Sequence, residues 1–130
     1  MRYDLLSTLT GGLLIVEGAA IAVLAIAQGG AIIGGDTSAL ESAIALLVLT
    51  VIGAAAVVAF GVATIRGRSW GRSGGIVTQL LILAVAGGAA TGVFAHPLLG
   101  LQLAIPAIIT LVLLFAAVRR AGRDARAERP

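Results

Sequence analysis

One carboxyl group in a largely apolar stretch is the residue of this sequence best suited to chemistry. Glu17 lies near the middle of a stretch that extends from about 5 to 27. At the centre of a bilayer, a carboxyl group costs about 2.5–3.5 kcal/mol on insertion scales unless it is protonated, paired or hydrated. Glu17 could therefore couple the movement of protons or cations. Alternatively, it could be a protonated side chain that hydrogen-bonds to a neighbouring helix and serves only packing.

Two glutamines in other apolar stretches are further candidates for a polar niche. Gln102 lies four residues before Pro106. Because proline has no N–H, the carbonyl of Gln102 loses its usual helical partner, which leaves a free carbonyl beside an amide side chain. Most such sites are kinks satisfied by a neighbouring hydroxyl or by water, and a ligand site is the alternative. Gln79 is the second candidate for this niche.

The sequence contains no recognisable motif of a catalytic, metal-binding or cofactor-binding site. The chain has no cysteine and one histidine, His96, which is too few for an imidazole-based metal site. Hydroxyl groups such as those of Thr50 and Thr64 have no evident base beside them, although nucleophilic catalysis requires one. We therefore predict that the protein is not an enzyme and holds no metal or cofactor.

Composition places these residues in a membrane. Of the 130 residues, 59% are apolar and 12% are charged, whereas a soluble domain is about 45–50% apolar and about 25% charged. A chain this short has too much surface to hide the excess in a soluble core. Four stretches are long enough to cross about 30 Å of hydrocarbon as helices. These predicted spans are about 5–27, 39–65, 76–95 and 98–118.

The predicted fold class is therefore all-α: a polytopic membrane protein with an antiparallel bundle of four transmembrane helices, residues 1–118, and a basic tail, 119–130. All nine basic residues are arginine. They precede the first span, lie between the second and third, or follow the fourth: Arg2; Arg66, Arg68 and Arg72; Arg119, Arg120, Arg123, Arg126 and Arg129. The other two connections contain Asp36 and Glu41 and no arginine.

This charge pattern predicts an orientation. Positive residues stay on the cytoplasmic side, so both termini, the middle loop and the tail are expected there, with the protein in the cell membrane. The arginines flank apolar spans, and no polar domain is present to carry a nucleic-acid surface. We therefore predict the lipid bilayer as a partner, with anionic lipids favoured by the arginines, and no nucleic acid.

The connections contain further signals. Ser38 and Glu41 have the spacing of a capping box, which predicts Ser38 as the N-cap of the second helix. Residues 66–75 are predicted to form a basic turn whose glycines permit the chain reversal. Trp70 among arginines is typical of an interfacial anchor, so we predict that one group of four residues anchors the protein to lipid: Arg66, Arg68, Trp70 and Arg72.

Small residues recur at the spacing used for close helix packing. Gly18 belongs to a stripe beside Glu17, and Gly88 and Gly92 continue a ladder that begins at Ala84. Such stripes let neighbouring backbones approach closely. They indicate either packing within the chain or a seam of a homo- or hetero-oligomer.

The middle loop resembles that of uncharacterised actinobacterial four-helix integral membrane proteins, which carry an arginine-rich, tryptophan-containing segment before the third span. No activity is implied by this resemblance. The helix count and the position of Glu17 also resemble small multidrug-resistance transporters, whose first helix carries an essential carboxylate. This chain departs from that family in two ways. It has few aromatic residues, only 4% of the chain, and a strong charge bias.

Two functions remain as hypotheses. The first is a non-enzymatic membrane subunit or scaffold that interacts with membrane proteins or lipids. It is favoured because helix-packing motifs are abundant and no polar cluster is evident. The alternative is a small proton-coupled transporter or channel that uses Glu17.

Overall fold

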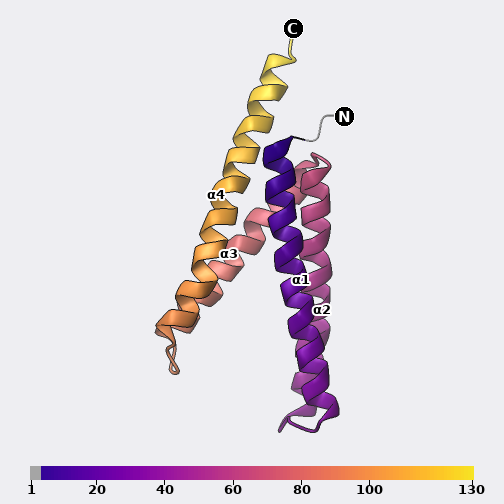
Figure 1. Ribbon diagram of the computed structural model, residues 1–130, viewed down its shortest axis with the longest axis vertical. Coiled ribbons are helices and arrows are strands. Elements are labelled where there is room, and N and C mark those ends of the chain that lie inside the picture. The colour runs from indigo at the N-terminus through magenta and orange to yellow at the C-terminus, as the bar shows by residue number, and fades with distance from the viewer. Residues whose placement is uncertain (1–3) are drawn as a thin grey trace.

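The computed structural model describes residues 4–130, which form four α-helices and no strand; Arg2 lies outside these residues. The helices are α1 (Leu5–Ile33), α2 (Leu40–Ile65), α3 (Ser69–Thr91) and α4 (Pro97–Ala127) (Figure 1). Each is long and apolar enough to cross a membrane. The predicted all-α class with four membrane-spanning helices is thus confirmed.

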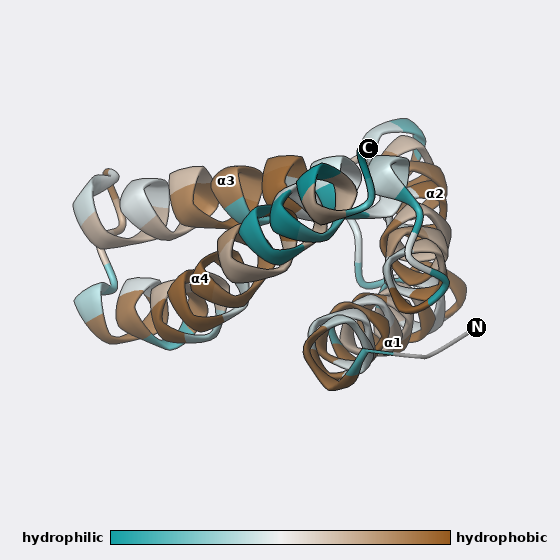
Figure 2. Ribbon diagram, turned by 90° about the horizontal axis from the view of Figure 1, so that it is seen from above, coloured by the Kyte–Doolittle hydropathy of each residue, from teal (hydrophilic) through white to brown (hydrophobic). Residues whose placement is uncertain are grey.

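The helices form two antiparallel hairpins, α1–α2 and α3–α4. The start of α1, the α2–α3 turn and the end of α4 lie at the same end of the molecule (Figure 1). Seen from above, hydrophilic residues are most visible along the last turns of α4 (Figure 2). We call this shared end of the molecule the arginine end, because the α2–α3 turn and the end of α4 carry the arginines of the described chain.

Three helices extend beyond one end of the predicted spans, whereas α2 matches its span closely and α3 ends at Thr91, before the predicted end at 95. α1 continues to Ile33, α3 begins at Ser69, and α4 continues to Ala127, so most of the basic tail is a helical extension. Pro97 occupies the first turn of α4, where a missing N–H costs nothing. The helical lengths follow from backbone hydrogen bonding, which does not stop where the apolar stretch stops.

Two local predictions were wrong. α2 begins at Leu40 with Ala39 as its N-cap and no side-chain cap hydrogen bond, so Ser38 does not form the predicted capping box. The hydroxyl of Thr37 instead accepts a bond from the Ala39 N–H, at 3.4 Å.

The basic turn is also shorter than predicted. The reversal is made at Gly67, whose φ of 74° lies in the left-handed region that glycine adopts without strain. Gly71, Gly74 and Gly75 lie within α3 and serve packing. A Cβ at Gly71 would lie 2.6 Å from the backbone nitrogen of Thr64, so this glycine lets α3 pack closely on α2.

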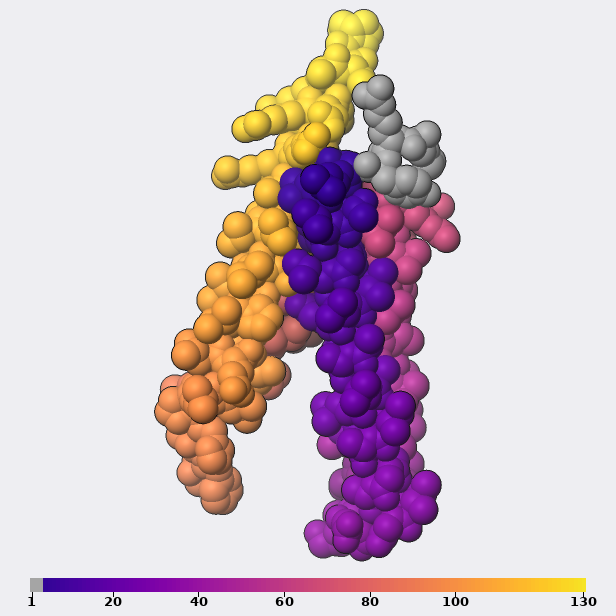
Figure 3. Space-filling view, viewed as in Figure 1, coloured from indigo at the N-terminus to yellow at the C-terminus, as the bar shows by residue number. Residues whose placement is uncertain are grey.

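The core lies where the two hairpins meet. Leu14 of α1, Val57 of α2 and Leu114 of α4 form its buried apolar cluster. Away from the arginine end the hairpins diverge, and the space-filling view shows an open wedge between α1 and α4 (Figure 3). A cavity of about 380 Å³ lies between the hairpins, lined by apolar side chains such as Ile21 and Leu103 and by Thr78.

Candidate functional site

The carboxyl group of Glu17 is the centre of a polar cluster that joins three helices. The side-chain amide of Gln79 on α3 donates a hydrogen bond to Oε2 of Glu17, with 2.5 Å between the atoms. The hydroxyl of Thr110 on α4 donates to Oε1, at 3.0 Å. Each carboxyl oxygen of Glu17, on α1, therefore accepts a hydrogen bond from the α3–α4 hairpin.

The cluster is largely removed from the surface. Gln79 is 0% exposed and Thr110 is 1% exposed, whereas Glu17 is half-buried. The Oε1 atom of Gln79 is buried and has no hydrogen-bond partner within residues 4–130. In surroundings of low polarity, hydrogen bonds are stronger and unpaired polar atoms cost more. The cluster can therefore hold the two hairpins together, and it retains one acceptor for a further donor.

Glycines next to the cluster allow the helices to approach. Gly75 lies one turn before Gln79, and a Cβ there would come within 2.9 Å of the Leu14 side chain. Gly18 follows Glu17 directly, and a Cβ there would lie 2.5 Å from the side chain of Val58. The predicted packing role of Gly18 thus has a contact in the α1–α2 hairpin.

The members of this cluster were only partly predictable. Glu17 and Gln79 were candidate residues, but their pairing was not predicted, and Thr110 was missed altogether. A hydroxyl near the middle of the fourth span, one turn after Pro106, was the available signal. Gln102 is exposed on α4 and does not join Gln79, so the structure separates the two glutamines proposed for one niche.

The small residues of α3 pack against α4 on one side of the helix, which is not the side of the predicted ladder. Gly100 of α4 packs against Ala86 and Ala90, the face that also carries Gln79. No atom of another element lies within 4 Å of a Cβ built at Gly88, and at Gly92 the close atoms are those of Gly88 itself. Gly88 and Gly92 therefore do not pack against another helix of the chain.

The predicted anchoring residues surround the α2–α3 turn. The ring of Trp70 packs edge-to-face against Phe60, with the centroids 6.0 Å apart. Arg72 donates to the backbone carbonyl of Gly67, at 3.1 Å, which ties it to the turn. Arg66 and Arg68 are exposed.

Charged groups elsewhere in residues 4–130 form one ion pair and no cluster that could hold a metal ion. Arg120 near the end of α4 forms an ion pair with Asp4 before α1, at 3.1 Å. Among residues 4–130, histidine, aspartate and glutamate side chains nowhere gather in groups of three that could hold a metal ion. The Glu17 cluster is therefore the candidate site.

No protein-family model matches the chain, and neither a curated protein nor a solved structure is significantly similar to it.

Proposed function

We propose that the protein is a small non-enzymatic membrane subunit or scaffold. Glu17 joins its two helical hairpins, and its lipid-facing helix surfaces bind other membrane components. One observation carries this proposal: both carboxyl oxygens of Glu17 already accept hydrogen bonds from the opposite hairpin. The one membrane-embedded carboxyl group is thus used to hold the helices together.

The surroundings of the cluster support a structural role. The cavity between the hairpins is lined almost entirely by apolar side chains. An apolar cavity does not hold a chain of water molecules, which proton transfer toward Glu17 would use. The small-residue face at Gly88 is open to contact from outside the chain, as a subunit interface would be.

A second candidate function, a proton-coupled transporter or channel, is favoured by one observation. The buried Oε1 atom of Gln79 has no donor, although it belongs to the amide that faces Glu17. If the amide turns over, this oxygen can accept a hydrogen bond from a protonated Glu17. The cluster could then alternate between two protonation states.

The variant Glu17→Gln separates the two functions. Its amide oxygen can still accept from Thr110, and its N–H can donate to Oε1 of Gln79 once that amide turns over. The fold is therefore retained within about 1 kcal/mol. If the protein is a scaffold, the proton flux is the same in three kinds of vesicle: those carrying the wild type, those carrying Glu17→Gln and those without protein. Flux that requires Glu17 would contradict the scaffold and establish the transporter. Glu41→Gln, at an exposed carboxyl group, is the matched control.

Association is tested by gentle extraction of the wild type into a mild detergent. A subunit is expected to co-purify with other membrane components, so the particles should contain more protein mass than one chain of 12.9 kDa. A lone protomer with no bound protein or lipid would remove the support for a scaffold.

A further inference from the structure

A small cavity beside the α2–α3 turn combines positive charge with an apolar floor. It has a volume of about 350 Å³, with two arginines and a tryptophan at its rim and three small side chains below: Arg66, Arg68 and Trp70; Ala59, Val62 and Ala63. An apolar floor under guanidinium groups fits a ligand that is anionic at one end and apolar at the other.

The charge at the rim is uncompensated. Within residues 4–130 the ion pair is Arg120 with Asp4. No carboxyl group of these residues therefore lies within ion-pair distance of Arg66 or Arg68. Arg72 donates a hydrogen bond to the carbonyl of Gly67 and does not line this cavity. Arginine binds phosphate through paired N–H donors. Two free guanidinium groups beside an interfacial tryptophan therefore suit a phosphate-bearing headgroup.

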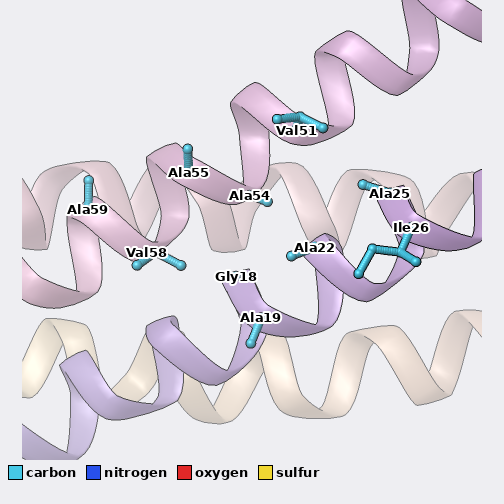
Figure 4. A pocket seen from close by; sticks show the side chains of 10 residues that line it. All are labelled: Gly18, Ala19, Ala22, Ala25, Ile26, Val51, Ala54, Ala55, Val58 and Ala59. Atoms are coloured by element: carbon cyan, nitrogen blue, oxygen red, sulfur yellow. The ribbon is translucent and has the colours of Figure 1, made fainter. Parts of the chain in front are cut away.

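The apolar floor continues into a longer groove. A groove of about 670 Å³ runs between α1 and α2, lined by small and branched side chains of both helices (Figure 4). In this view Ala22 of α1 lies across from Ala54 of α2, and Gly18 lies beside Val58. Ala59 lines both the groove and the cavity at the arginine turn. The two hollows thus adjoin at Ala59.

The spacing of the α2 residues fits one acyl chain. Val51, Ala55, Ala59, Val62 and Arg66 follow one another at intervals of three or four residues, which places them on one face of the helix. From Ala59 to Val51 the helix rises about 12 Å. Ala59 itself lies about 10 Å from Arg66 along the helix. An acyl chain that crosses a leaflet of about 15 Å from the turn therefore reaches the Ala59 end of the groove.

We propose that these two adjoining hollows are a binding site for one anionic phospholipid. The headgroup phosphate is held by Arg66 and Arg68 next to Trp70, and one acyl chain lies in the groove between α1 and α2. This inference rests on the proposed scaffold function, and it names an anionic phospholipid as one membrane component that the scaffold binds. The lipid site itself requires only that the arginine turn lies at a membrane surface, whichever function Glu17 has.

Native mass spectrometry of the detergent-solubilised full chain tests the site, with phosphatidylglycerol and phosphatidylcholine as competing probes. The wild type is expected to retain one phosphatidylglycerol with a preference of roughly tenfold or more, since each interfacial arginine contributes to anionic-lipid binding. The double variant Arg66→Gln/Arg68→Gln should lose this preference. Arg119→Gln/Arg123→Gln, which removes the same charge from α4, should keep it. Equal retention of both lipids by the wild type would overturn the proposal.

Two further arms identify the source of the phosphate and the role of the groove. Millimolar inorganic phosphate should leave the lipid bound, because the acyl chain contributes apolar contact; displacement would show a simple phosphate site and contradict the proposal. Ala55→Phe, which fills the groove while leaving the arginines in place, should weaken lipid retention, and unchanged retention would exclude the groove. Helical content by circular dichroism checks that each variant is folded. Failure of the lipid site leaves the Glu17→Gln result, and with it the scaffold proposal, unaffected.

Discussion

At the scale of single residues, a membrane carboxyl group takes its role from its donors. Glu17 alone suggests either proton coupling or helix association. The amide of Gln79 and the hydroxyl of Thr110 supply one hydrogen bond to each of its oxygens. A carboxyl group satisfied in this way costs less in the membrane, and it links α1 to both helices of the other hairpin.

Removing one donor should weaken this link by a small, measurable amount. Thr110→Val is expected to lower the free energy of unfolding by about 0.6 kcal/mol and by no more than about 1.7, the range found for hydrogen bonds between membrane helices. Unfolding in mixed micelles with increasing SDS measures it. Thr91→Val is the matched control, because that exposed hydroxyl bonds only to a carbonyl of its own helix. Equal losses in the two variants would contradict a specific role for Thr110.

At the scale of elements, glycine contacts set the distance between α1 and α2. Gly11 and Gly61 lie opposite each other, and a Cβ on Gly61 would come within 2.7 Å of the carbonyl oxygen of Gly11. Without a hydrophobic driving force inside lipid, such close backbone packing is the main attraction between helices. The α1–α2 hairpin thus depends on small residues more than on large apolar ones.

Gly61→Ala should therefore destabilise the hairpin although alanine favours helix formation. The added methyl group overpacks the contact, and we expect a loss of about 1–3 kcal/mol in the free energy of unfolding. The control is Gly53→Ala on the same helix, where no atom lies within 4 Å of the added Cβ. That variant should be neutral or slightly stabilised. If Gly61→Ala were as stable as Gly53→Ala, the backbones of α1 and α2 would not be in close contact at Gly61.

At the scale of the whole molecule, the two hairpins meet in the core and separate away from the arginine end (Figure 3). The start of α1, the α2–α3 turn and the end of α4 share one end (Figure 1). This arrangement fits a chain that keeps its arginines on one side of the bilayer. We infer from the positive-inside rule that this side is the cytoplasm.

Single cysteines test this orientation cleanly, because the natural chain contains none. Ser38→Cys lies in the α1–α2 connection and Ser69→Cys at the start of α3, and both positions are exposed. In intact cells, a membrane-impermeant maleimide is expected to label the cysteine at position 38. It should reach position 69 only after the membrane is permeabilised. Labelling of position 69 from outside would reverse the inferred topology.

The class of the fold and the number of helices follow from the sequence by itself. Hydropathy is a local property, and a stretch of about 20 apolar residues has no stable alternative to a helix in lipid. Tertiary structure alone decided which polar groups meet. Gln79 and Thr110 lie 62 and 93 positions from Glu17, so their contact depends on the rotation and register of each helix. The glycines show the same limit of the sequence. Gly71, predicted to lie in a turn, packs against α2, whereas Gly88, predicted to pack, has no other helix in contact with it. The spacing of small residues does not say which helix lies opposite.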